Sequence, residues 1–470
     1  MRLHAHYTAR MVDPRRQLHP VNPSTGEALE VVDCSTPAEV ADAVARARAA
    51  QPAWEAMGLE ARAERVLAFA AELQTPELAN RLAAAVTREM GKPIAQSRGE
   101  VATVAGRANS FVERAREACV LEETSEAGTE VHIHWRALGV AAVIAPWNYP
   151  LSTPNSLVLS ALLTGNTVVL KPSEYTPQAG ALYHAVLSRH LPPGVFELVQ
   201  GAGETGAALV DADVDMVAFT GSIKTGQAIM RTAAGGMKRL VLELGGKDPM
   251  IVLPGADLDA AAKHAARESV RNSGQVCVSV ERVFVPKELE AEFAAKVEAE
   301  LADIRIGDPT AEDTFMGPMA NPGQREHVLA QLADAEKKGA EIRVRGESRS
   351  PGFFLTPSLA LGVTEEMDLA RDETFGPVVA ISTYEDVDDA LRRANLGAYG
   401  LGASVWGPEN EETDRIASGV RAGMVGINRG LSAAGGAPWV GWKMSGFGYS
   451  RSKDGMRQFM QPQTHSRRQR

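Results

Sequence analysis

Residues 139–150 read GVAAVIAPWNYP, and this stretch indicates the fold class. Its first seven residues form a nearly continuous apolar run, which is typical of a strand buried on both faces of a sheet. Comparable runs occupy residues 167–170, 195–199, 216–219 and 240–242. Helical patterns separate them, at residues 156–163, 177–189 and 225–233. Buried strands that alternate with helices predict an α/β fold with a parallel sheet.

The pattern continues on both sides of this series. On the amino-terminal side, TPAE at residues 36–39 is a capping box with proline at the first helical position, and helical patterns follow at residues 61–88 and 95–118. On the carboxyl-terminal side, a second α/β series has predicted strands at residues 250–253, 282–285, 378–382, 404–406 and 424–427. Because 470 residues exceed what one hydrophobic core usually supports, we expect two large domains or more.

The composition excludes several classes of protein. Asp and Glu number 59 against 49 Lys and Arg, and a net charge of -10 argues against a nucleic-acid partner. Three cysteines, Cys34, Cys119 and Cys277, are too few for a disulfide framework and indicate a reducing compartment. No apolar run reaches membrane-spanning length, and residues 1–16 lack the apolar segment of a secretory signal. We therefore predict a cytoplasmic protein without a membrane partner.

Cys277 lies in RNSGQVCV, residues 271–278. A single cysteine between two valines is most often a small buried hydrophobic residue. The glycine and glutamine before it are also compatible with an ordinary turn at the end of a helix. This segment alone favours a structural role for the cysteine.

Glu243 begins ELGGKDP, residues 243–249, directly after the predicted strand at residues 240–242. The carboxyl ends of strands are where α/β sheets place functional groups. A carboxylate beside an apolar strand has a raised pKa, as a general base requires. The alternative is a strand-ending turn with solvated charges, which explains the glycines but not the carboxylate.

Asn148 lies between the two prolines of the PWNYP turn, at the end of the strand at residues 139–145. An amide held there can donate a hydrogen bond to a developing oxyanion. The alternative is a turn asparagine, a common role for this residue.

Two glycine clusters occupy strand-to-helix turns: FTGSIKTG at residues 219–226 and GAGETG at residues 201–206. Glycine lets the backbone approach a phosphate, and a helix N-terminus attracts its negative charge. Each cluster is weak support by itself, because many such turns look the same.

Taken together, these segments resemble the aldehyde dehydrogenase family from Asn22 to about Gln463. The motifs that carry the resemblance are PWNYP at Pro146, KPSE at Lys171, FTGS at Phe219, ELGGK at Glu243, GQVC at Gly274, ETFGP at Glu373 and NLGAYGL at Asn395. The segment PWVGWKMSGFGYSRS from Pro438 matches less closely, with tryptophans where phenylalanine and tyrosine are usual. Seven motifs in the family's order make the resemblance specific.

The resemblance implies an enzyme that oxidises an aldehyde to the carboxylic acid. Cys277 would be the nucleophile, acting as a thiolate and forming a thioester. The Asn148 amide and the backbone N–H of Cys277 would stabilise the tetrahedral alkoxide, and Glu243 would activate the water that releases the acid.

The resemblance also implies a nicotinamide cofactor, NAD with NADP as the alternative. Lys171 and Glu174 match residues that hold the adenosine ribose. Gly221 and Ser222, together with Trp147, match contacts to the pyrophosphate.

Two further positions match contacts near the nicotinamide: Glu373 would bind its ribose, and Phe375 would lie beside the ring. The domains implied are a Rossmann-like dinucleotide-binding domain at residues 1–118 and 139–242 and an α/β catalytic domain at residues 243–440.

A small β oligomerisation element is implied at residues 119–138 and 456–467, which predicts a homodimer or homotetramer. EVHIHW at residues 130–135 alternates as a strand does. His132 and His134 could suggest a metal pair, but no third ligand converges in the sequence. We expect no metal site and two surface-facing strand histidines.

The substrate would be a small aldehyde, and Arg271 bears on its class. Succinate-semialdehyde dehydrogenases resemble this chain at Arg271, where their arginine binds the distal carboxylate of the substrate. Two positions depart from those enzymes: a second arginine is replaced by Ser156, and a partner cysteine by Ser279. A solvated or structural Arg271 is the alternative, and the valines around Cys277 suit an uncharged aldehyde equally well.

Two other functions compete with this prediction. The first is a CoA-acylating or phosphate-linked aldehyde dehydrogenase, in which another nucleophile than water resolves the thioester. Glu243 argues against it, because a general base for water is present. The second is a catalytically silent structural or binding protein on the same fold, which predicts a missing nucleophile, whereas Cys277 is present.

Overall fold

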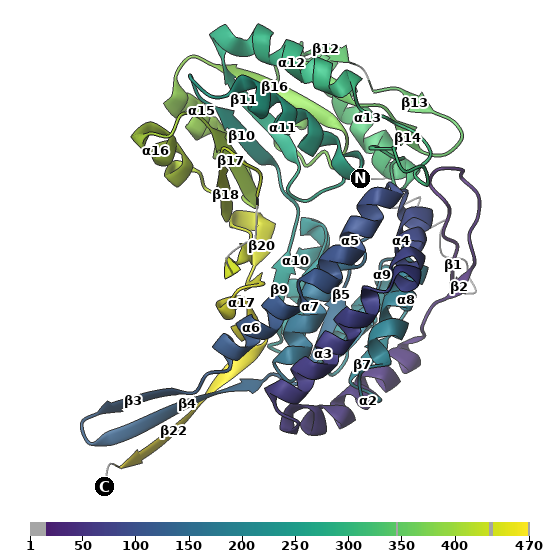
Figure 1. Ribbon diagram of the computed structural model, residues 1–470, viewed down its shortest axis with the longest axis vertical. Helices are drawn as coiled ribbons and strands as arrows, with labels where there is room; N and C mark the ends of the chain where they lie inside the picture. Colours follow the sequence, from purple (N-terminus) through teal and green to yellow (C-terminus); the bar gives the residue numbers. More distant parts are fainter. Residues whose placement is uncertain (1–15, 345, 432–435, 469–470) are drawn as a thin grey trace.

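A computed structural model describes residues 16–344, 346–431 and 436–468. It has two large sheets, each covered by helices, and a long β ribbon that extends from the body of the molecule (Figure 1). The predicted α/β class is confirmed. Among the described residues, no helix is both long enough and apolar enough to cross a membrane.

The first sheet has the strand order β20-β9-β8-β5-β6-β7. Its strands are β5 (Val140–Ile144), β6 (Thr167–Lys171), β7 (Phe196–Leu198), β8 (Met216–Thr220), β9 (Arg239–Glu243) and β20 (Gly446–Phe447). All are parallel except β20, which pairs antiparallel with β9. Successive residues of β5 pack into different cores: Ala141 and Val143 on one face, Val140 and Ala142 on the other. A strand buried on both faces must be apolar throughout, which is why the run at residues 139–145 predicted it.

Helices cover both faces of this sheet. They are α2 (Pro37–Ala56), α3 (Leu59–Leu73), α4 (Pro76–Met90), α5 (Ile94–Gly106), α6 (Ala108–Ala118), α7 (Ser152–Leu163), α8 (Pro177–Ser188), α9 (Gly203–Asp211) and α10 (Ile223–Ala234). The predicted capping box of α2 is confirmed, because the side chains of Thr36 and Glu39 each accept the other's backbone N–H.

Two helical patterns are each divided in the structure. The pattern at residues 61–88 forms α3 and α4, because Pro76 starts a new helix and keeps Thr75 extended. The pattern at residues 95–118 forms α5 and α6, and the break follows Gly106, a weak helix former.

The second sheet has the order β12-β15-β16-β11-β10-β17-β18, with β12 antiparallel to β15. Its strands are β10 (Asp248–Val252), β11 (Val280–Pro286), β12 (Glu341–Val344), β15 (Ser358–Leu361), β16 (Val378–Tyr384), β17 (Gly402–Trp406) and β18 (Met424–Ile427). The helices around it are α11 (Leu258–Val270), α12 (Glu290–Ala302), α13 (Pro322–Lys337), α14 (Asp368–Arg371), α15 (Val387–Ala394) and α16 (Glu411–Gly419). The five predicted strands are present.

The remaining short elements lie in the connections. They are β1 (Gln17–Leu18), β2 (Val32–Asp33), β13 (Ser348–Arg349), β14 (Phe354–Leu355), β19 (Trp439–Val440), β21 (Tyr449–Ser450) and α17 (Lys453–Arg457).

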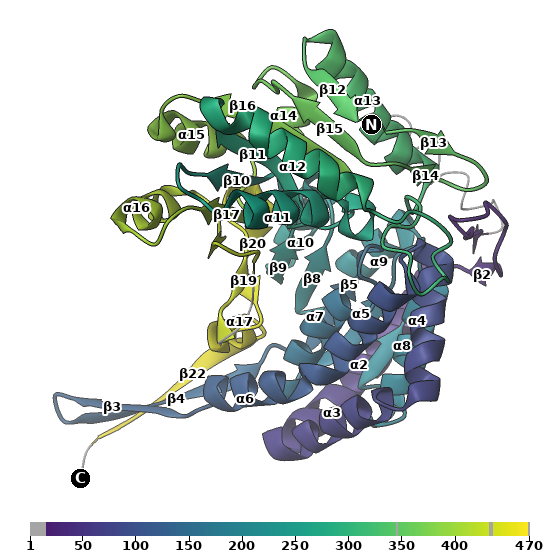
Figure 2. The ribbon, with the colours of Figure 1, turned by 45° about the horizontal axis from the view of Figure 1, so that its top comes forward.

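The ribbon consists of β3 (Glu122–Glu126), β4 (Thr129–Ala137) and β22 (Met460–Arg468), all antiparallel. It projects away from both sheets in the two views (Figures 1 and 2). His132 and His134 point to the same side of β4, where the ring of His465 lies 4.4 Å from that of His134. Among the described residues, no group of three or more His, Cys, Asp or Glu side chains could hold a metal ion.

Candidate active site

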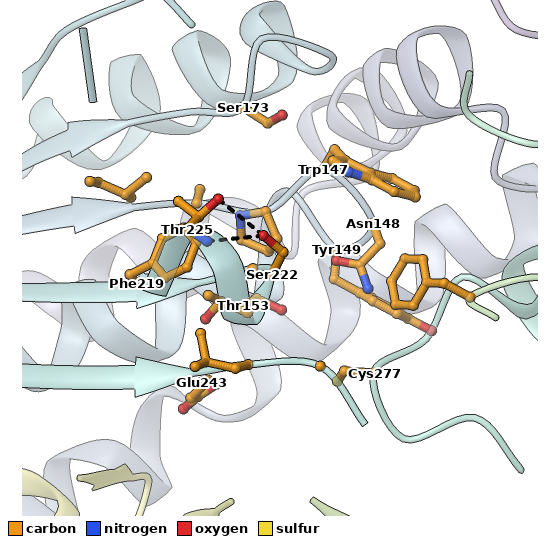
Figure 3. Close-up of a pocket in the computed structure, with 18 of the residues that line it drawn as sticks. Trp147, Asn148, Tyr149, Thr153, Ser173, Phe219, Ser222, Thr225, Glu243 and Cys277 are labelled. Atoms are coloured by element: carbon orange, nitrogen blue, oxygen red, sulfur yellow. Dashed lines mark hydrogen bonds between the residues drawn. The ribbon is translucent and has the colours of Figure 1, made fainter. Parts of the chain in front are cut away.

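Every predicted site residue lines one cavity of about 1640 Å³. Its lining comes from the carboxyl ends of β5, β6, β8 and β9, from the loop after α11 and from the loop before β16. Figure 3 shows Asn148, Glu243 and Cys277 among the residues that line this cavity, together with Trp147, Ser173 and Ser222.

The loop that carries Cys277 has an unusual backbone. After α11 ends at Val270, Asn272 and Ser273 adopt φ of 53° and 58°, in the left-handed region that such residues seldom occupy. Gly274 follows with φ of 73°, and a Cβ atom there would collide with the backbone of Gly376. The turn therefore requires glycine at position 274, and it places Cys277 in the wall of the cavity.

Hydrogen bonds to distant segments hold this loop. Asn272 Nδ2 donates to the backbone oxygen of Asn148 at 3.2 Å, and Ser273 Oγ donates to that of Gly317 at 2.8 Å. Gln275 Oε1 accepts the backbone N–H of Ala320 at 2.9 Å. A strained backbone conformation persists only where surrounding contacts fix it. These hydrogen bonds fix the backbone of the Cys277 loop in this way.

Asn148 is buried, and its Nδ2 donates to the backbone oxygen of Gln275 at 3.0 Å. An amide nitrogen has two N–H groups, so one of them remains for a ligand. The turn itself is held by Glu100, whose Oε1 accepts the backbone N–H groups of Leu151 and Ser152, both at 2.9 Å.

Glu243 ends β9 as a buried carboxylate, and Ser450 Oγ donates to its Oε1. Burial raises the pKa of Glu243, and the nearby charge of Arg451 lowers it in part. A raised pKa is the property that the sequence predicted for a general base at this position.

Burial, together with the charge of Glu243, raises the pKa of the Cys277 thiol to about 12. The thiolate that the prediction requires is therefore disfavoured in the resting enzyme and has to form when the sulfur attacks. The thiol proton therefore has to leave as the sulfur attacks.

The cofactor part of the cavity begins at Lys171. This buried lysine donates from Nζ to the backbone oxygens of Pro172 and Gly201, both at 2.7 Å, so one of its three N–H groups is left. Glu174 lines the cavity next to it, and Ser173 Oγ donates to Glu174 Oε2 at 3.4 Å.

The FTGS segment joins β8 to the N-terminus of α10. Ser222 caps α10 by accepting the backbone N–H of Thr225 at 3.3 Å (Figure 3). Gly221 donates its N–H to the backbone oxygen of Glu243 at 3.0 Å. The first turn of α10 thus lines the cavity, and the N-terminus of a helix suits a phosphate group.

Glu373 approaches the ELGGK segment from the second sheet, and its Oε1 accepts the N–H of Gly246 at 3.0 Å. A Cβ atom on Gly245 would collide with this carboxylate, so the glycine leaves the room that Glu373 occupies. The ring of Phe375 meets that of Trp147 edge to face, with centroids 5.3 Å apart. Three motifs that are far apart in the sequence therefore form one wall.

Arg271 lines the cavity but already has acceptors. Its Nε and Nη2 donate to Glu268 Oε2 at 3.0 and 2.8 Å, and its Nη1 donates to the Tyr149 hydroxyl at 3.0 Å. Ser156 is buried within α7, where its Oγ donates to the backbone oxygen of Ser152 at 3.1 Å.

Several residues at this site escaped the sequence analysis. Asn272, Gln275 and Glu100 hold the turns that carry Cys277 and Asn148, and Ser450 and Arg451 adjoin Glu243. The only available signal for the last two was the divergent segment from Pro438, which contains both.

Comparisons with known proteins show the family of this chain. Residues 11–465 match the family described as "Aldehyde dehydrogenase family". A probable succinate-semialdehyde dehydrogenase, NADP(+), of Sinorhizobium fredii is 35% identical over 95% of this chain and 92% of its own. The crystal structure of lactaldehyde dehydrogenase from Escherichia coli is 34% identical with a TM-score of 0.92, over 96% of each chain. A structure of indole-3-acetaldehyde dehydrogenase with NAD+ is 31% identical with a TM-score of 0.93, over 96% of this chain and 93% of its own.

Proposed function

The chain belongs to the aldehyde dehydrogenase family, and we propose that it oxidises an aldehyde to the carboxylic acid through a thioester on Cys277. The observation that carries this proposal is the meeting of Cys277, Asn148 and Glu243 at one cavity, whose other part has the features of a dinucleotide site.

In the first stage, Cys277 Sγ attacks the carbonyl carbon and the thiol proton passes to solvent. The adduct is a tetrahedral alkoxide, and the free N–H of the Asn148 amide is available to donate to its oxygen. Because this donor is held by Gln275 and the PWNYP turn, it needs no rearrangement when charge develops. Oxidation of the adduct then leaves the acyl group on the sulfur.

In the second stage, Glu243 takes a proton from water, which attacks the thioester and expels the Cys277 sulfur with release of the acid. Burial raises the pKa of Glu243 and thereby makes its carboxylate a stronger base.

The residues of the second half of the cavity fit a nicotinamide dinucleotide, which when bound supplies the hydride acceptor for the oxidation. Ser222 and Gly221 at the start of α10, with Trp147, would hold its phosphates. Lys171 and Glu174 would hold the adenosine ribose.

Glu373 would bind the nicotinamide ribose beside Phe375. The lack of a side chain at Gly245 supports this role, because it leaves the room that the Glu373 carboxylate occupies.

We expect NAD to be preferred over NADP. Glu174 would accept hydrogen bonds from the ribose hydroxyls, whereas a 2′-phosphate would meet the charge of this carboxylate. Lys171 has committed two N–H groups to backbone oxygens, which limits how far it can compensate. The measurement is kcat/KM for both cofactors in the wild type and in Glu174→Gln, where the preference should shrink. Equal or better kcat/KM with NADP in the wild type would contradict this expectation. The test is needed because the similar protein of Sinorhizobium fredii is named as an NADP(+) enzyme.

The overall reaction is tested by NADH production from a panel of acidic, aliphatic and aromatic aldehydes, with thiol titration of Cys277. A CoA-acylating enzyme would need CoA for turnover, and a silent protein would form no NADH. No observation in the structure favours either alternative.

The substrate class that we favour is a short aldehyde with a second, carboxylate group. Arg271 is one candidate for binding that carboxylate, because it lines the cavity six residues before Cys277. Its bonds to Glu268 and Tyr149 would then have to rearrange.

We expect a homo-oligomer, a dimer or tetramer, in which the β ribbon pairs across subunits. The ribbon projects as an exposed sheet whose outer strands, β3 and β22, each pair only with β4 among the described residues, and such edges are prone to pairing. Light scattering at micromolar concentration should give a multiple of 50.1 kDa. A mass of one chain would contradict it.

Three free cysteines are compatible with a reducing, cytoplasmic compartment.

A further inference from the structure

We propose that Arg451 binds the carboxylate of the aldehyde substrate and sets the preference of the site for substrates that carry one. The inference rests on the proposed function, because it assumes that Cys277 and Glu243 carry out the reaction. Arg451 lies in the segment from Pro438, which matches the family's pattern less closely than the other motifs do.

Arg451 lines the same cavity as Cys277 and Glu243. Its guanidinium carbon lies 4.2 Å from the centroid of the Trp439 ring, which also lines the cavity. An aromatic ring holds a guanidinium by its face and leaves the N–H groups at its edge free to donate.

The Nε of Arg451 is buried and has no hydrogen-bond partner among the described residues. A buried donor of a charged group without an acceptor is costly, and a carboxylate accepts two parallel N–H groups from an arginine. The missing partner therefore has the chemistry of a bound carboxylate.

The backbone of Arg451 is strained. Its φ is 72°, and the N–H of Ser452 donates to the backbone oxygen of Ser450 at 3.0 Å, which closes a three-residue turn around it. The turn is held on both sides: Ser450 Oγ donates to Glu243, and Ser452 caps α17. A long side chain kept in this conformation beside the catalytic base points to a function rather than to packing.

The other cations of the cavity distinguish Arg451 from Arg271. Arg271 donates three of its five N–H groups, to Glu268 and Tyr149. Arg107 also lines the cavity, and burial, together with the charge of Arg107, lowers the pKa of Arg451, whereas the charge of Glu243 raises it. An anion placed between the two arginines would relieve their repulsion.

A different role for Arg451 would be to tune Glu243 and Cys277 by its charge alone, since it acts on the pKa of both. The two roles predict different substrate dependences. Loss of a tuning charge would slow the oxidation of every aldehyde, whereas loss of a carboxylate-binding group would slow acidic aldehydes more.

The test compares succinate semialdehyde with butanal, which has the same chain length and no carboxylate. Their kcat/KM ratio is measured in the wild type, Arg451→Gln, Arg451→Lys and Arg271→Gln. We expect the wild type to favour the acidic aldehyde, and Arg451→Gln to lower the ratio by about 10- to 100-fold, as for lost hydrogen bonds to a charged group. Arg451→Lys should keep part of the ratio, and Arg271→Gln should lower it less than Arg451→Gln does.

Equal losses on both aldehydes in Arg451→Gln, or a ratio that falls only in Arg271→Gln, would overturn the proposal. If Arg451→Gln does not fold, competitive inhibition of wild-type butanal oxidation decides: succinate should inhibit more strongly than butyrate, and equal inhibition would overturn the proposal. Failure of the proposed function is distinguishable, because the wild type would then oxidise neither aldehyde.

Discussion

Cys277→Ala should lower aldehyde oxidation by about 10⁴-fold or more, because no acyl group can form on the enzyme without the nucleophile. Dinucleotide binding should change little, since the residues that would hold the cofactor belong to β6, α10 and the loop before β16 rather than to the Cys277 loop. The measurements are steady-state NADH production and a fluorescence titration with NADH on the same preparation.

Cys34→Ala and Cys119→Ala are the matched controls. Both thiols are free and half-buried, and neither is among the described residues that line the cavity. Wild-type turnover in Cys277→Ala, or a comparable loss in either control, would remove Cys277 from the nucleophile role.

The α/β architecture was predictable because of how its strands are buried. A strand such as β5 has a different core on each face, so its sequence is apolar throughout and easily recognised. The strands β12 and β15 were missed: each has only four residues, and β12 is partly exposed at the edge of its sheet.

The residues that we propose as catalytic could be identified only as a set. Cys277 between two valines favours a structural role by itself, and the order of the motifs reversed that interpretation. Their supports were not predictable, because they depend on contacts across the chain. Glu100 lies 51 residues before the backbone N–H of Leu151 that it accepts, and it forms a buried ion pair with Lys92. Neither residue belongs to a motif.

The surroundings of Glu243 illustrate the same limit. The sequence places it at the end of a strand, but Ser450 and Arg451 reach it only because β20 pairs with β9. That pairing joins segments more than 200 residues apart, through two strands of which one has two residues. The local environment that determines how this base titrates is therefore visible only in the structure.

Glu243→Gln should separate the two stages of the reaction. We expect a burst of NADH close to one per active site, followed by turnover about 10²- to 10⁴-fold slower than in the wild type, the usual contribution of a general base. The amide retains an oxygen to accept the hydrogen bond from Ser450 but cannot take a proton from water. The measurement is stopped-flow NADH formation with enzyme at a known concentration of active sites.

The burst can be checked independently, because the accumulating species would be a thioester on Cys277. An added nucleophile such as hydroxylamine should release it and accelerate turnover of Glu243→Gln more than that of the wild type.

The pH dependence gives a second check. Since burial raises the pKa of Glu243, more of it is protonated near neutral pH than in water, so the hydrolytic stage in the wild type should accelerate as pH rises through that pKa. Glu243→Gln should lose this dependence. A small loss in both stages without a burst would instead mean that another group activates the water and that Glu243 serves the cavity only by its charge and its bond to Ser450.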